Sequence, residues 1–107
     1  MNYVIDSGPG RVVFWSMAKM RQLKDLVSVG PKTVEDFHLL GITTVEQLTT
    51  QSADRLYERL CRKKGVRIDP CQHDVFTAAI AQAKNPRLPL EKCQWWYWSG
   101  IRKRARA

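Results

Sequence analysis

The stretch LVSVGPKT, residues 26–33, decides the fold because it separates two segments whose apolar residues follow helical spacing. Before it, Met20, Leu23 and Leu26 recur at intervals that place them on one helical face. After it, Pro31 suits the first turn of a helix, and Gly41 suits a left-handed position at a helix end. The pattern predicts a helix from Met20 to Val27, a tight turn, and a second helix of about nine residues from Pro31 or Lys32.

This turn resembles a helix-hairpin-helix motif, whose apolar-Gly-apolar-Gly pattern lets the backbone approach a nucleic-acid strand. The N–H groups that open the second helix then point at a phosphate, which the helix dipole favours. The candidate phosphate-binding residues are Ser28, Val29, Gly30, Lys32 and Thr33. Since Ser28 stands at the first glycine position, either positive φ is not required there or the turn approaches a strand less closely. A turn that only reverses the chain is the simpler alternative.

Cap residues predict three further helices. The first is a short helix that follows the Thr44–Gln47 capping box and buries Val45 and Leu48. The second runs from Ser52 to about Lys64, and the third lies between Asp69-Pro70 and Asn85-Pro86. We expect an aromatic helix or turn at residues 90–98. The predicted fold class is all-α, a compact bundle of about five short helices with a helix-hairpin-helix element over residues 17–98.

The two ends of the chain differ from this domain. Residues 1–16 carry two short β-prone runs on either side of a Gly-Pro-Gly sequence, which fits a loose hairpin or a flexible arm. Because Met17 and Met20 stand where the helical pattern begins, an extension that is not native to the domain fits equally well. Residues 99–107 are basic and lack apolar periodicity, a pattern that predicts a disordered tail.

Composition points to an anionic partner. The 107 residues include 18 Lys and Arg against 10 Asp and Glu, a formal charge of +8. Nucleic acid is the first expectation, and an acidic protein or membrane surface comes after it. The supporting basic face comprises Arg55, Arg59, Arg62, Lys63 and Lys64. No apolar run approaches the ~20 residues that span a bilayer, and no export signal is evident, so the sequence predicts a cytoplasmic protein outside the membrane.

Three cysteines, an odd number, favour free thiols in a reducing compartment. The only candidate metal set is Cys61, Cys71, His73 and Cys93. Structural zinc sites begin with two ligands a few residues apart, and the one close pair would diverge within a single helical turn. Buried thiols are therefore favoured over zinc or a redox pair of Cys61 with Cys71.

The run of aromatic residues at 95–98 favours core packing, with a protein interface or base stacking as alternatives. Catalysis has little support, because the sequence has no phosphate-binding Gly-rich loop, no His-Glu-x-x-His and no carboxylate cluster for two metals. His38 and His73 have no evident nucleophile beside them. We expect no enzyme activity and no cofactor.

Five short segments occur in a characteristic order along the chain: GPKT at 30–33, LGITT at 40–44, LYERLC at 56–61, DPC at 69–71 and WWYW at 95–98. This order of motifs resembles the bacterial pathogenicity-locus family of small helix-hairpin-helix proteins, and more distantly the C-terminal domain of the competence regulator TfoX. The resemblance covers residues 17–98. It implies a DNA-binding fold and supplies no catalytic residue.

The sequence thus predicts weak DNA-backbone binding without base specificity. A major-groove helix-turn-helix is disfavoured because the second helix would carry Glu35 and Asp36 toward the bases. The alternative is an adaptor or regulator that uses the same fold to bind an acidic protein or a second copy of itself.

The cysteine pattern gives a first test. Protein purified without chelator should contain well under one equivalent of zinc, because the thiols are expected to pack rather than to ligate. Elemental analysis measures this, and stoichiometric zinc would overturn the interpretation.

Overall fold

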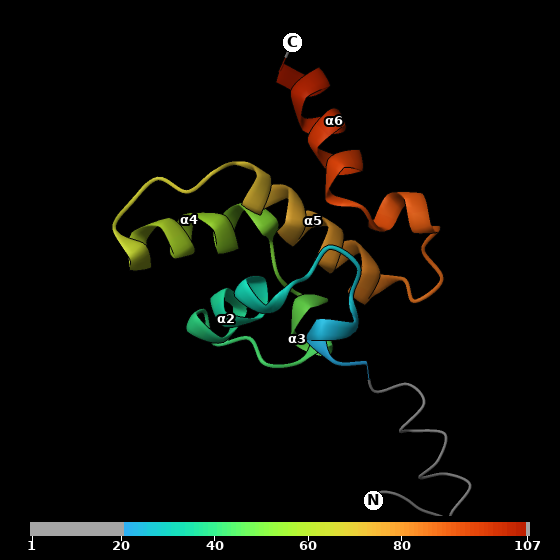
Figure 1. The fold of residues 1–107 in the computed structure, drawn as a ribbon, viewed down its shortest axis with the longest axis horizontal. Helices are drawn as coiled ribbons and strands as arrows, with labels where there is room; N and C mark the ends of the chain where they lie inside the picture. The colour runs from blue at the N-terminus through green and yellow to red at the C-terminus, as the bar shows by residue number, and fades with distance from the viewer. Residues whose placement is uncertain (1–20, 107) are drawn as a thin grey trace, which may run out of the picture.

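The computed structural model describes residues 21–106, and every regular element in that range is helical (Figure 1). In chain order they are η1 (Leu23–Asp25), α2 (Pro31–Leu39), α3 (Val45–Leu48), α4 (Ala53–Lys64), α5 (Cys71–Lys84), η2 (Leu90–Cys93) and α6 (Trp95–Arg106). The prediction of an all-α bundle is confirmed. The predicted arm at residues 1–16 lies outside the described residues.

Local cap chemistry sets the bounds of α3 and α4 as the sequence predicted. The hydroxyl of Thr44 accepts from the Gln47 N–H while the Gln47 side chain accepts from the Thr44 N–H, which completes the capping box of α3. Ser52 caps α4 through the Arg55 N–H. Gly65 ends α4 in the left-handed region, at φ 68°.

The other two predicted helices also have the expected ends. Pro31 is the first residue of α2, and Gly41, at φ 84°, follows its last turn. At the start of α5, the Asp69 carboxylate accepts from the Cys71 N–H at 2.8 Å. The helix runs to Lys84, directly before Asn85.

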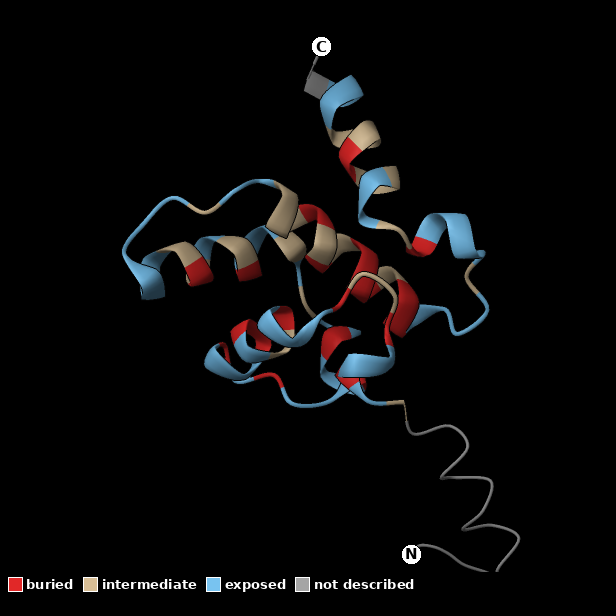
Figure 2. Ribbon diagram, viewed as in Figure 1, coloured by how far each residue is buried: buried red, intermediate tan, exposed pale blue. Residues whose placement is uncertain are grey.

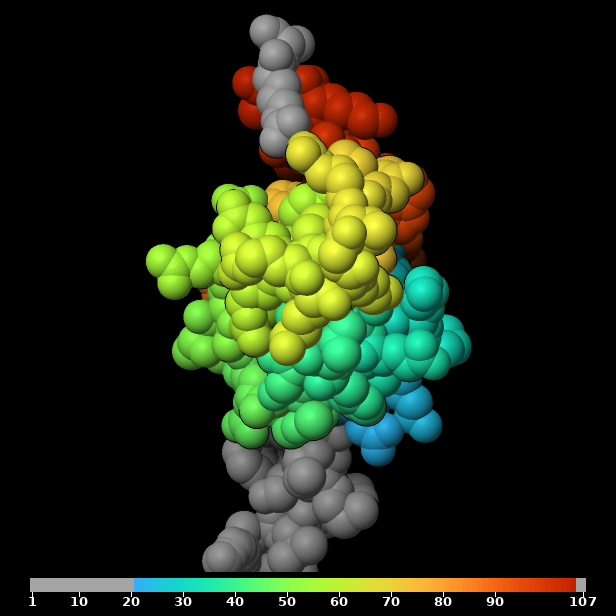
Figure 3. All heavy atoms as spheres, turned by 90° about the vertical axis from the view of Figure 1, so that its left-hand side faces the viewer, coloured from blue at the N-terminus to red at the C-terminus, as the bar shows by residue number. Residues whose placement is uncertain are grey.

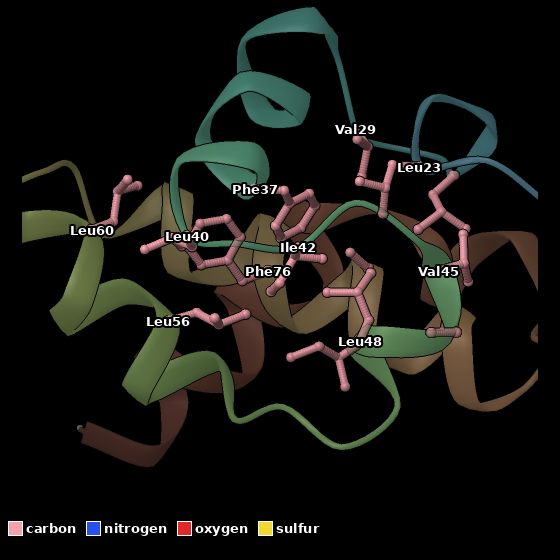
Figure 4. Packing of buried hydrophobic residues seen from close by; sticks show 14 residues of the cluster. Leu23, Val29, Phe37, Leu40, Ile42, Val45, Leu48, Leu56, Leu60 and Phe76 are labelled. Atoms are coloured by element: carbon pink, nitrogen blue, oxygen red, sulfur yellow. The ribbon is translucent and has the colours of Figure 1, made fainter. Parts of the chain in front are cut away.

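The core lies where α2, α3 and α4 meet α5. Figure 2 shows their buried positions turned toward the middle of the molecule, and Figure 3 shows α2 and α4 side by side on one face. Phe37 of α2 and Phe76 of α5 meet with ring centroids 5.1 Å apart. Leu48, Leu56 and Leu60 close around them from α3 and α4, and all five are fully buried (Figure 4). Burying each such side chain contributes roughly 1.5–3 kcal/mol, so this cluster is the main source of stability.

The prediction of a first helix, from Met20 to Val27, is wrong within the described residues. Only one 3₁₀ turn, Leu23–Asp25, forms where a helix from Met20 to Val27 was expected. Leu23 and Leu26 are buried as their spacing predicted, but Leu26 is extended and the backbone N–H and C=O of Val27 bond to the side chain of Gln82. A side chain from α5 thus takes the bonds that a continuing helix would need. The described part of the chain contains a full helix on only the second side of the predicted hairpin.

The prediction of a disordered tail from Ser99 is also wrong, because α6 continues through Arg106. Ser99 is buried, and the guanidinium of Arg102 donates to both carboxylate oxygens of Asp74, each at 2.9 Å. Asp74 lies on α5 and is only 1% exposed. The buried carboxylate of Asp74 therefore holds the basic residues 99–106 in place. A pattern of apolar residues in the sequence does not predict an ion pair of this kind.

None of the helices in the described part of the chain is long and apolar enough to cross a membrane.

The ion pair between α5 and α6 generates a stability prediction. Asp74→Asn removes the charge that faces Arg102, and since the Arg102 side chain is partly solvated, the free energy of unfolding should fall by about 1–3 kcal/mol. Urea denaturation measures the loss, and amide exchange should increase mainly in α6.

Glu58→Gln is the matched control because it removes an exposed carboxylate from α4. It should change stability by less than about 0.5 kcal/mol. Equal effects of the two substitutions would show that the pair does not hold α6.

Candidate nucleic-acid interface

The turn before α2 is held in a conformation that normally selects glycine. Ser28 has φ 73°, so the first glycine position of the motif does take the left-handed conformation here. Its hydroxyl donates to the Cys93 carbonyl at 3.3 Å and accepts from the Trp95 N–H at 3.0 Å. Serine is tolerated because these two bonds tie the turn to the beginning of α6.

A second contact fixes the turn to α5. The Gln82 amide oxygen accepts from the Val27 N–H at 2.9 Å, and its nitrogen donates to the Val27 carbonyl, also at 2.9 Å. The same nitrogen donates to the Ala78 carbonyl at 3.2 Å. Gln82 is only 5% exposed, so its buried amide satisfies both backbone hydrogen-bonding groups of Val27. The backbone direction at Gly30 is therefore set by the core.

The first turn of α2 is open toward solvent. Within the described residues no side chain caps this end, and the first bond of the helix runs from the Val34 N–H to the Gly30 carbonyl at 3.0 Å. Gly30 is exposed, and a Cβ added there would meet nothing within 4 Å. The exposed amides of this first turn are therefore accessible to an anion.

The five residues predicted to bind phosphate divide into two groups. Gly30 and Lys32 are exposed at the start of α2. Ser28 is half-buried and bonded within the protein, while Val29 and Thr33 are each 8% exposed. Their side chains pack, so only backbone amides and Lys32 present polar groups outward.

The basic residues of α4 also fall into two groups, those with structural contacts and those that remain exposed. Arg59 donates to the Leu40 carbonyl at 3.0 Å and so caps the end of α2. Lys64 pairs with the buried Asp36 at 2.8 Å, and this hydrogen bond raises the pKa of Lys64. These two cations join α4 to α2. Arg55, Arg62 and Lys63 remain exposed.

The Lys64–Asp36 pair places the last turn of α4 beside α2. Lys32 precedes Asp36 by one helical turn, so it lies on the same side of α2 as this pair. We call Lys32, Arg62, Lys63 and Lys64 the α2–α4 basic patch, since the last three occupy the final turn of α4. Asp36 is neutralised inside the protein, so of the two acids on α2 only Glu35 is exposed beside the patch.

A cleft of about 730 Å³ between α4, α5 and α6 was not predicted. Arg62, Arg67 and Arg102 line it, together with Tyr57 and His73, whose rings meet edge to face at 5.9 Å. His73 Nε2 lies 2.5 Å from the Asp54 carboxylate, and the Tyr57 hydroxyl donates to the Ile68 carbonyl. Most of the lining lies within residues 54–73, where one side of α4 follows helical spacing, and only Arg102 comes from a distant part of the chain.

The cysteines remain separate thiols in the described residues, and no group of three or more metal-binding side chains occurs there. Cys93 is buried, and burial raises its pKa. Cys61 and Cys71 are half-buried rather than buried as expected. Burial, and then the hydrogen bond with Asp69, raise the pKa of Cys71. Raised pKa values keep thiols protonated, which disfavours both nucleophilic attack and metal binding.

Comparison with known proteins adds the family. The family model described as Cdd1, pathogenicity locus, matches residues 16–104. The chain belongs to this family. Mitomycin resistance protein McrB of Streptomyces lavendulae is 38% identical over 82 residues, which cover 77% of this chain and 74% of that relative. No solved structure matches the chain significantly. The pathogenicity-locus match includes residues 99–104, which agrees with their place in α6 rather than in a separate tail.

The contacts of Ser28 generate a second prediction. Ser28→Ala loses both hydroxyl bonds while keeping a side chain in the left-handed region, so stability should fall by about 1–3 kcal/mol. Ser28→Gly loses the same bonds but relieves about 1 kcal/mol of backbone strain, and should be the milder change. Thermal and urea unfolding measure both. If alanine is tolerated as well as glycine, the left-handed conformation does not constrain this turn.

Proposed function

We propose that this protein binds nucleic acid, DNA first, through its phosphates and without reading bases. The observation that carries the proposal is the uncapped start of α2, with Gly30 at the surface and the exposed Lys32 one helical turn before the Asp36–Lys64 pair. Helix dipole and ammonium groups act on the same small volume, which favours a phosphate there. The formal charge of +8 adds long-range attraction to a polyanion.

The packing of α2 supports backbone contact rather than base readout. Thr33, Asp36 and Phe37 are buried, so one side of this nine-residue helix belongs to the core. Glu35 on the exposed side would repel a phosphate backbone lying along the helix. A phosphate bound at the first turn of α2 avoids that repulsion. Because phosphates are the same at every base pair, such a contact does not read the base sequence.

We further propose that the protein binds rather than catalyses. The pKa of Cys71 is raised, so this thiol is not activated as a nucleophile. An adaptor that binds an acidic protein through the same patch is the competing function. Salt dependence alone does not separate the two, but competition by DNA against the protein partner does.

The relative's name offers a cellular readout. If this chain shares the mitomycin resistance for which McrB is named, its expression should increase survival of a sensitive host on that drug. Loss of that increase in a Lys32→Glu variant would connect resistance to the α2–α4 basic patch.

The central prediction concerns Lys32. If the patch and the start of α2 neutralise about three phosphates, log K should fall with log salt at a slope near −2.7, from ~0.9 per phosphate on duplex DNA. Lys32→Glu replaces a contact with repulsion, so binding should weaken about tenfold or more, equally for unrelated sequences. Fluorescence anisotropy with labelled duplexes measures both effects.

Arg87→Glu is the matched control, because it makes the same charge change in the exposed loop after α5, which lies across the molecule from α2 and α4 (Figure 1). It should weaken binding much less. Equal losses from the two variants would mean that only net charge matters, and unchanged binding by Lys32→Glu would reject the interface.

A further inference from the structure

The exposed side of α6 carries aromatic rings and cations together. Trp95 is 38% exposed and Trp96 is 52% exposed, at the start of the helix. Lys103 and Arg104 are exposed two turns later. The segment 95–106 contains four cations and no acid, and in Figures 1 and 3 its end stands beyond the rest of the molecule. This surface is separate from the α2–α4 basic patch.

The other side of α6 is fixed by the protein itself. Asp74 holds Arg102, Ser99 is buried, and the Ser28 hydroxyl accepts from the Trp95 N–H. Near the start of the helix, the Trp98 indole N–H donates to the Lys92 carbonyl at 2.8 Å. Since these contacts hold the helix in place, Trp96 needs no ordering of the backbone before it binds a ligand.

Helix geometry aligns the exposed ring with a cation. Trp96 and Lys103 are seven residues apart, which leaves them about 20° apart around the helix and roughly 10 Å apart along it. Arg104 follows directly. A ligand lying along this edge meets a flat aromatic surface and then one or two positive charges.

We propose that this edge of α6 binds single-stranded nucleic acid, with an unpaired base stacked on Trp96 and a neighbouring phosphate beside Lys103 and Arg104. The proposal rests on the proposed binding of nucleic acid and adds to it a preference for unpaired strands. Bases expose their faces only when unpaired, and stacking on an aromatic side chain tolerates any base.

The distribution of apolar surface disfavours a membrane as the occupant. An interfacial helix needs an apolar face along its length, with cations on the opposite face. In α6 the exposed indole rings lie at one end, and Lys103 shares a face with Trp96 two turns away. A strand that alternates flat bases with phosphates matches this arrangement better.

The test compares a labelled single-stranded oligonucleotide of mixed sequence with the corresponding duplex. Trp96→Ala should weaken single-strand binding about five- to a hundredfold, which corresponds to ~1–3 kcal/mol for one stacked base. Duplex binding should change less than about twofold, and because Trp96 is half exposed the melting temperature should hardly move. Trp96→Phe keeps a ring and should restore most of the affinity.

Leu90→Ala is the control, since it removes another exposed apolar side chain, 67% exposed, from the neighbouring η2. It should leave both affinities unchanged. Replacing Lys103 and Arg104 with alanine should reduce the single-strand salt slope by about 0.7, the value for the one phosphate that the two cations share.

The outcomes separate this proposal from the one on which it rests. If Lys32→Glu weakens duplex binding while Trp96→Ala leaves single-strand binding intact, the proposed function stands and the role of α6 is rejected. Failure of the wild type to bind any oligonucleotide rejects both. Binding to vesicles containing anionic lipid that depends on Trp96, with no effect on single strands, would assign α6 to a membrane surface instead.

Discussion

The buried amide of Gln82 is the contact on which the candidate interface depends. It satisfies the N–H and the carbonyl of Val27 at once, so a single α5 side chain fixes the turn that precedes α2. An amide is suited to this because it both donates and accepts, whereas a carboxylate only accepts. The direction of α2, and with it the place of Gly30, depends on this core residue as well as on the turn's own Ser28.

The elements that the sequence predicted correctly are those set by neighbours in the chain. The Thr44–Gln47 box, Ser52 and Gly65 act within a few residues of themselves, so their sequence signals are complete. Membership of the pathogenicity-locus family was also predictable, because it rests on ordered local motifs.

Features set by distant contacts were not predictable in the same way. The missing first helix depends on Gln82, 55 residues beyond Val27. The order of residues 99–106 depends on Asp74, 28 residues before Arg102. In both cases a polar side chain of α5, which reads as solvent-facing in a helical pattern, is buried and supplies the bond. Periodicity records apolar burial only, and it misses a buried polar anchor.

The formal charge likewise overestimates how many cations are available to a ligand at the candidate site. Arg59 holds the end of α2, Lys64 pairs with Asp36, and Arg102 pairs with Asp74, so three of the cations that suggested a nucleic-acid partner have structural contacts. The surface that remains for a ligand is smaller than the formal charge suggests. It is also better ordered, since the structural cations hold the helices that carry the free ones.

Ser28 connects the two surfaces proposed to contact nucleic acid. Its backbone sets the turn before α2, and its hydroxyl accepts from the Trp95 N–H at the start of α6. A shift of α6 that broke this bond would remove one of the contacts that make a left-handed serine tolerable, and the turn would lose support.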